Sequence, residues 1–180
     1  MKKHLFVRGF TLIELLLVLG LLAGLLLIGS SAYRQLRQRA DLQIAGSSLL
    51  AAARQARAQA MSSGYAVVLQ AQDARQWQLG WRLFVDRDGD GRFSNSDTLL
   101  QQQAPLPAGL QLQAPPHATG AANTMAAGYL LFNERGFPVA REGLQANGQL
   151  ELRHGEQLQR LFFDKTGRMR LCDAGSPDCA

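Results

Sequence analysis

The stretch FTLIELLLVLGLLAGLLLIG, residues 10–29, decides how this chain is organised. Its twenty residues include one charged side chain, Glu14. An apolar run of roughly 20 residues spans the hydrocarbon core of a bilayer as an α-helix. A carboxylate inside that core is costly, so it needs a partner and marks a functional position. We therefore predict a transmembrane helix over residues 10–29 and a functional role for Glu14.

Residues 1–9 precede the apolar run and carry the basic side chains Lys2, Lys3 and Arg8. The positive-inside rule places this segment on the cytoplasmic side of the inner membrane and the rest of the chain in the periplasm. One alternative is a secretory signal peptide cleaved near residues 30–32 (SSA), and another is a plain single-span anchor. Neither alternative accounts for a glutamate so early in the apolar run.

The segment Gly9-Phe10-Thr11-Leu12-Ile13-Glu14 resembles the processing site of class III signal peptides, which occur in prepilins of type IV pili and type II secretion systems. The resemblance implies that a prepilin peptidase cleaves after Gly9, removing residues 1–9 as a leader, and that Phe10 is then N-methylated. It also implies a partner for Glu14, the free ammonium of Phe10 in a neighbouring subunit.

The charge of the chain is modest once this leader is set aside. The whole chain of 180 residues has a net charge of +5, with 19 basic and 14 acidic residues. Three of the basic residues lie in the leader, which leaves 16 against 14, a net charge of +2. Nucleic-acid binding would therefore require a local cluster of charge. The remaining length suits one compact domain beyond the membrane.

After Gly29 the sequence becomes amphipathic. Apolar and small residues recur at steps of three and four, with arginines between them. No proline that would break a helix occurs before Pro105, and residues 62–64 (SSG) are typical of a helix C-terminus. We predict one helix from Phe10 to about Met61, with residues 30–62 as its amphipathic half. Its apolar stripe comprises Tyr33, Leu36, Ala40, Ile44, Ser47 and Ala51, broadened by Leu49, Leu50 and Ala53.

Residues 63–180 are expected to form a β-rich domain. Short strand-like runs alternate with turns rich in Gly, Pro, Asn or Asp. The predicted fold class is α+β, a pilin-like arrangement in which a long N-terminal helix packs on one or two antiparallel sheets. Residues 105–124 are rich in Ala, Pro and Gly, which predicts a long connecting segment. The expected strands cover residues 65–70, 77–85, 99–103, 110–113, 129–132, 149–153, 158–163 and 168–172.

Three segments of this domain, GWRLFVD (80–86), YLLFNERG (129–136) and TGRMRLC (166–172), are similar to the GspH/FimT group of minor pilins and pseudopilins. The resemblance implies a low-copy subunit that primes assembly of a filament or sits at its tip. It implies as partners other major and minor pilins or pseudopilins, the prepilin peptidase and an inner-membrane assembly platform.

Some members of that group, the FimT-like ones, resemble DNA receptors for natural transformation that use a Gly-Arg-x-Arg element, which matches residues 167–170 here. Residues 164–167 are typical of a hairpin turn, and the arginines of the following strand would project to one side about 7 Å apart. Such a strip suits the phosphates of double-stranded DNA, whereas the alternative is an ordinary solvated strand face. The candidate residues are Arg160, Lys165, Arg168 and Arg170.

Cys172 and Cys179 are the only two cysteines of the sequence, and six residues separate them. Outside the cytoplasm such a pair usually forms a disulfide, which would fix the C-terminal loop beside the basic strip. Metal binding is a poor alternative, because the C-x-x-C spacing is absent and no histidine is near.

Residues 86–97 have the spacing of an EF-hand-type calcium loop with Asp in place of the last Glu. The flanking segments are strand-like rather than helical, which favours a plain hairpin turn. If calcium binds, the candidate ligands are Asp86, Asp88, Asp90 and Asp97.

The sequence has no G-x-S-x-G, Walker A or zinc motif, so we predict a structural or binding protein rather than an enzyme, with no required cofactor. The main hypothesis is a minor type IV pilin that primes assembly or lies at the pilus tip. The alternatives are a FimT-like DNA receptor and a GspH-like minor pseudopilin of type II secretion. Whichever applies, we expect a single-pass inner-membrane protein that later enters a filament.

Overall fold

The computed structural model describes residues 11–73, 76–115 and 123–176, without the side chains of residues 25–31. The chain divides into two compact units, residues 1–37 and residues 38–180. One helix, α1 (Leu12–Ser63), contributes residues to both units.

In the first unit, α1 begins directly after Thr11, whose Oγ1 accepts a hydrogen bond from the Glu14 N–H at 3.3 Å. This contact satisfies one of the free N–H groups at the helix start. The large apolar side chains between Leu12 and Leu22 are exposed, as is Glu14. Among the described residues, no helix has both the length and the apolar character that crossing a membrane requires.

In the second unit, α1 turns a row of mostly small residues toward the core. The stripe expected from the sequence is corrected in part, because Ala40, Ile44, Ser47 and Ala51 are exposed, whereas Leu49 and Ala53 are buried as predicted. Small side chains on the helix let the strands approach it closely, and the strands then supply the large residues of the core. Ile44 lies on the helix face away from this core. Tyr33 and Leu36, in the first unit, are exposed as well. The buried residues in the described part of α1 are Leu42, Ala45, Gly46, Leu49, Ala52, Ala53, Ala56 and Ala60.

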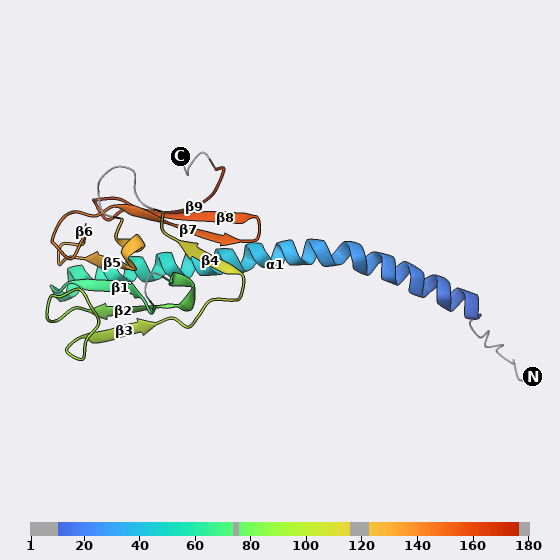
Figure 1. Cartoon of the computed structure of the whole chain (residues 1–180), viewed down its shortest axis with the longest axis horizontal. Helices are drawn as coiled ribbons and strands as arrows, with labels where there is room; N and C mark the ends of the chain where they lie inside the picture. Colours follow the sequence, from blue (N-terminus) through green and yellow to red (C-terminus); the bar gives the residue numbers. More distant parts are fainter. Residues whose placement is uncertain (1–10, 74–75, 116–122, 177–180) are drawn as a thin grey trace, which may run out of the picture. The chain divides into compact units, whose positions relative to one another are not determined.

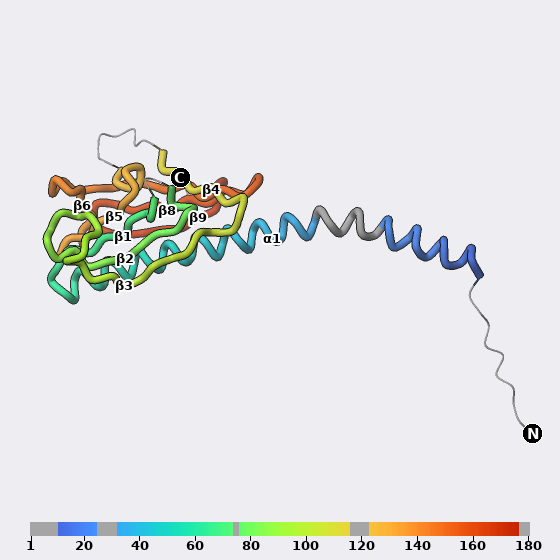
Figure 2. The backbone as a smooth tube through the Cα atoms, turned by 60° about the horizontal axis from the view of Figure 1, so that its bottom comes forward, coloured from blue at the N-terminus to red at the C-terminus, as the bar shows by residue number. Residues whose placement is uncertain are grey.

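Within the described residues, nine strands form two antiparallel sheets. Figure 1 shows how these strands lie along α1. The five-stranded sheet has the order β3-β2-β1-β5-β6, and the four-stranded sheet has the order β4-β7-β8-β9. Figure 2 shows β3, β2 and β1 side by side. The strands are β1 (Val67–Ala71), β2 (Trp81–Val85), β3 (Thr98–Gln102), β4 (Leu110–Gln113), β5 (Tyr129–Phe132), β6 (Pro138–Val139), β7 (Gly148–His154), β8 (Gln157–Phe163) and β9 (Met169–Asp173).

The main core lies where both sheets meet the second half of α1. Strand residues that point to the helix alternate with residues that point away, as in Leu150 and Leu152 of β7. Trp77 and Trp81 are fully buried in this core, and the Trp77 Nε1–H donates to the Met125 backbone oxygen at 3.0 Å. The α+β fold predicted from the sequence is therefore confirmed.

The outer face of the five-stranded sheet carries a smaller core, built from Val68, Phe84, Tyr129 and Leu131. The loop between β2 and β3 contributes to its cover, because the Phe93 ring meets the Phe84 ring edge-on at 5.2 Å between centroids. This loop and the β8–β9 hairpin contain most of the candidate site residues.

Two details of the strand prediction were wrong. Residues 77–85 are not one strand, because Trp77–Leu79 form a short 3₁₀ helix, η1, and Gly80 has a positive φ of 99°. A Cβ at Gly80 would lie 2.2 Å from the Gln103 backbone oxygen, so only glycine fits at this break. The sequence analysis also missed β6, whose two residues are too few to show a period.

Candidate functional site

The β8–β9 hairpin carries most of the predicted basic strip. Its turn closes through the Gly167 N–H, which donates to the Asp164 oxygen at 2.9 Å, and through the Asp164 N–H, which donates to the Arg168 oxygen at 3.1 Å. Met169 is buried while Arg168 and Arg170 are exposed, so the two arginines project to the solvent side. Lys165 is exposed at the turn.

Asp164 organises this turn through its carboxylate. Its Oδ1 accepts the Thr166 N–H at 2.8 Å, the Thr166 hydroxyl at 2.6 Å and the Arg168 N–H at 3.0 Å. Burial raises the pKa of the Asp164 carboxyl, but these hydrogen bonds and the nearby Arg168 charge outweigh burial, so the pKa lies below its ordinary value. The turn is therefore best ordered when Asp164 is ionised.

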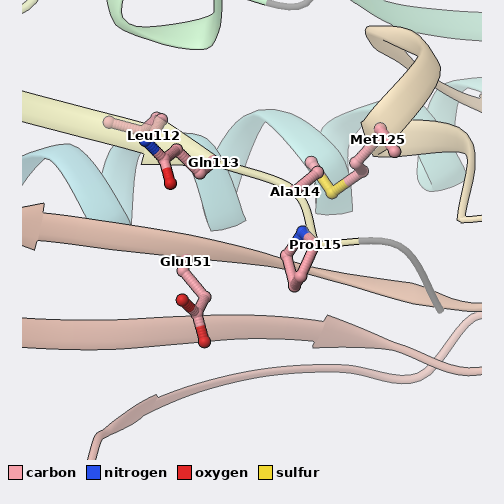
Figure 3. Close-up of a pocket in the computed structure, with 7 residues that line it drawn as sticks. Leu112, Gln113, Ala114, Pro115, Met125 and Glu151 are labelled. Atoms are coloured by element: carbon pink, nitrogen blue, oxygen red, sulfur yellow. The ribbon is translucent and has the colours of Figure 1, made fainter. Parts of the chain in front are cut away.

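Arg160 differs from the other candidate residues of the basic strip because it forms an ion pair. Its Nε donates to Glu151 Oε1 at 2.9 Å, because Arg160 in β8 lies directly opposite Glu151 in β7. Glu151 also lines a cavity of about 630 Å³ at the end of β4, beside Leu112 and Met125 (Figure 3). The Arg160 charge is thus partly neutralised, and this residue contributes less to the strip than the sequence suggested.

Two arginines of α1 lie beside the hairpin instead. Arg54, Arg57 and Arg168 line one surface groove of about 590 Å³, together with Met61 and Met169. The sequence analysis treated the arginines of α1, Arg54 and Arg57 among them, only as residues between the apolar positions. Nothing in the local sequence links them to hairpin residues more than 100 positions away. Arg54, Arg57 and Arg168 therefore form a positive cluster around this groove, and Arg168 lines a second pocket with Arg170.

Arg57 also holds the hairpin in place. Its guanidinium donates to the backbone oxygens of Gly136 at 3.1 Å, Gly167 at 3.0 Å and Thr166 at 3.2 Å. Gly167 has a φ of 79°, and a Cβ there would lie 2.6 Å from the Gly136 oxygen. The glycine of the Gly-Arg-x-Arg element is thus required by packing.

The loop between β2 and β3 brings together three of the four predicted calcium ligands. Carboxylate oxygens of Asp86, Asp88 and Asp97 lie within 4.8 Å of one another. Asp90 is not in this cluster, and its Oδ1 accepts the Arg92 N–H at 2.6 Å. The flanking elements are strands, as expected for a hairpin loop.

The clustered carboxylates already have donors from the loop itself. Asp86 accepts the Gly89 and Gly91 N–H groups at 2.9 Å each, and Asp97 accepts two further backbone N–H groups. Burial raises the pKa of Asp86, whereas the Ser96 hydroxyl is the main cause that lowers the pKa of Asp88. This network stabilises the loop without a cation, although oxygen ligands in this arrangement are also suited to a hard cation.

The remaining predicted site residues lie near the chain ends. Gly9 and Phe10 lie outside the described residues, as does Cys179. Glu14 is exposed near the start of α1. Cys172 is disulfide-bonded, and the pairing with Cys179 stays a prediction.

Comparison with known proteins gives the family. The family model described as "Type II transport protein GspH" matches residues 45–176, so the chain belongs to the GspH family. This agrees with the resemblance to the GspH/FimT group found in the sequence. A comparison with curated proteins found no significant match.

Two similar solved structures are those of the type IV minor pilin FimU of Pseudomonas aeruginosa and the minor pseudopilin EpsH of the type II secretion system of Vibrio cholerae. FimU is 20% identical, with a TM-score of 0.59 over 79% of this chain and 92% of that chain. EpsH is 14% identical, with a TM-score of 0.52 over 76% of this chain and 99% of that chain. At these identities the likeness establishes the fold.

Proposed function

We propose that this chain is a minor pilin that primes assembly of a type IV pilus or lies at its tip. Membership of the GspH family is the observation that carries the proposal. In this proposal, residues 10–29 anchor the chain in the inner membrane until the helix is extracted into the filament. The exposed apolar side chains of α1, among them Leu12, Leu36 and Ile44, support a role for the helix in packing against other subunits.

Glu14 is proposed to set the register of that packing. Its carboxylate is exposed among exposed leucines, so burying this face against other helices would desolvate a charge. A desolvated charge is tolerated when an opposite charge pairs with it. The ammonium of Phe10 in a neighbouring subunit, freed by peptidase cleavage after Gly9, would supply that charge.

Substitution of Glu14 tests this role in the native host. We expect Glu14→Gln to leave leader removal intact, as judged by intact mass, but to reduce the chain in sheared filaments about tenfold, because one ion pair of roughly 1.5 kcal/mol is lost. Glu14→Asp keeps the carboxylate and serves as the matched control, with partial recovery expected. Wild-type incorporation of Glu14→Gln would refute the register role.

A second candidate function is reception of DNA on a transformation pilus. The arginines Arg54, Arg57, Arg168 and Arg170 favour it, because Arg168 lines one groove with the two helix arginines and a second pocket with Arg170. Several guanidiniums gathered in this way suit a phosphate backbone. Nothing in this cluster suggests base readout, so the binding would be independent of sequence.

The DNA proposal predicts a salt-dependent affinity. Full-length chain in a neutral detergent should bind duplex DNA at low salt, and each lost phosphate contact should lower the slope of log K against log salt by about 0.9. Arg168→Ala and Arg170→Ala test the strip, and Arg135→Ala is the control because Arg135 is exposed outside the cluster. Absence of wild-type binding at low salt would exclude this function.

A third candidate, a minor pseudopilin of type II secretion, is favoured by the matched family, which is that of the type II transport protein GspH. It involves the same helix packing with different partners. Deleting the chain in its host distinguishes the two: loss of surface pili with normal protein secretion supports the pilin, and the reverse supports the pseudopilin.

A further inference from the structure

A cleft on the outer face of the five-stranded sheet gathers three arginines from three separate segments. Arg82 comes from β2, Arg92 from the β2–β3 loop and Arg141 from the segment after β6. We call it the arginine cleft. It has a volume of about 320 Å³, and no acidic side chain is among its described lining residues, which are Gln70, Ala71, Gln72, Arg82, Arg92, Phe93, Ala127 and Arg141.

Two of the guanidiniums are held in place by aromatic rings. Arg141 lies over the Tyr129 ring at 3.9 Å from its centroid and donates from Nε and Nη2 to the Gly91 oxygen at 3.0 and 2.9 Å. Arg82 lies over the Phe93 ring at 5.0 Å. Because these contacts fix the two side chains before any ligand arrives, little side-chain entropy is lost on binding.

The cleft also contains an unmet hydrogen-bond donor. Arg82 Nε is buried without a partner, which costs free energy in the unliganded protein. Two acidic residues of the adjoining loop have other partners, because the Asp90 carboxylate accepts the Arg92 backbone N–H and Asp86 accepts the N–H groups of Gly89 and Gly91. Arg82 Nε has almost no accessible surface, so an anion in the cleft would reach it only if the Arg82 side chain moved. An anionic oxygen in the cleft would offset the repulsion among the three cations.

We propose that the arginine cleft binds a phosphate group. A guanidinium has five N–H donors, so Arg141 and Arg82 keep donors beyond those given to the Gly91 and Gln72 oxygens. Three cations from different directions match the several oxygens of a phosphate better than the two of a carboxylate. The source is a free phosphorylated molecule or the backbone of a DNA strand. The cleft lies on a different sheet from the β8–β9 hairpin, so it does not depend on the proposed DNA strip.

Calorimetric titration of the full-length chain in a neutral detergent at low salt tests the proposal, with inorganic phosphate and an oligothymidylate as probes. Arg92→Gln is the main variant, because this side chain is exposed and its loss leaves the core intact. Arg135→Gln removes the same charge outside the cleft and is the matched control. We expect Arg92→Gln to weaken binding about tenfold and Arg135→Gln to leave it unchanged.

The two probes distinguish the sources. If phosphate and oligothymidylate bind with comparable affinity per phosphate and Arg92→Gln weakens both, the ligand is a free phosphorylated molecule. If only oligothymidylate binds and Arg92→Gln weakens that binding, the ligand is a DNA strand. The proposal is overturned if neither probe binds. It is also overturned if binding is lost in Arg168→Gln but kept in Arg92→Gln, or if poly-glutamate binds at the cleft more tightly than either probe.

Discussion

Replacing Gly167 by alanine tests whether the glycine of the Gly-Arg-x-Arg element is required by packing. The new Cβ would lie 2.6 Å from the Gly136 oxygen and 3.0 Å from Arg57 Nε. Relief of that overlap requires the hairpin to move away from Gly136 and Arg57, which lengthens the Arg57 hydrogen bonds to the Gly167 and Thr166 oxygens at 3.0 and 3.2 Å. A positive φ costs alanine about 1–2 kcal/mol, and weakening one bond from a charged donor costs about 1.5–3 kcal/mol.

The expected loss in the free energy of unfolding is therefore about 3–4 kcal/mol, or a fall of about 10 °C in the midpoint at roughly 3 °C per kcal/mol. Tryptophan fluorescence measures it well, since Trp77 and Trp81 are both fully buried in the core of the second unit. The signal thus reports on the unit that contains the hairpin.

Gly143→Ala is the matched control. Gly143 has a φ of 80°, against 79° at Gly167, and a Cβ there would meet no atom within 4 Å. This variant should show the backbone cost alone, about 1–2 kcal/mol. If the two variants unfold within about 0.5 kcal/mol of each other, the Arg57–Gly136–Gly167 contact does not hold the hairpin, and the packing argument fails.

Two further predictions concern the carboxylates. The folded-state pKa of Asp164 lies below the ordinary value of 3.8, so its carboxylate stabilises the fold above that pH, and the contribution is lost as the pH falls through the folded-state pKa. Asp164→Asn should therefore be less stable than wild type at neutral pH and equally stable in strong acid, while Glu142→Gln, at an exposed position, should track wild type throughout. If Asp164→Asn remains less stable than wild type in strong acid, the electrostatic cause is contradicted. Because loop donors already serve Asp86, Asp88 and Asp97, we expect millimolar calcium to change the unfolding midpoint by less than about 1 °C. A larger rise that Asp88→Asn abolishes would establish a calcium site.

The sequence predicted the elements of this fold better than their pairing. Strands such as Leu110–Gln113 and Tyr129–Phe132 were placed with their observed bounds, because turn residues flank short apolar runs. The order β3-β2-β1-β5-β6 was not predictable, since β1 pairs with β5 across about 60 residues and no local pattern encodes that partner. The buried face of α1 was misjudged because alanines on both sides of the helix make two stripes nearly equivalent.

For the candidate basic strip, too, the local sequence predicted the strand but not the partners of its side chains. The alternation through Met169 was enough to place Arg168 and Arg170 on one side. Arg160 was grouped with them because it is near in sequence, but the register of β7 against β8 sets it opposite Glu151. Register depends on the whole sheet, so charge compensation between strands cannot be read from one strand alone.

Arg57 affects the hairpin both through its charge and through its hydrogen bonds. Its three bonds to backbone oxygens leave its charge uncancelled, so it adds to the positive field of the cluster while it fixes the turn that presents Arg168. An Arg57 variant would therefore lose DNA binding either because a positive charge is removed or because the turn is no longer fixed. Arg170→Ala separates them, because this exposed side chain follows the turn and takes no part in closing it. Weaker DNA binding by Arg170→Ala at an unchanged unfolding midpoint would be an effect of charge alone, whereas unchanged binding would remove Arg170 from the strip.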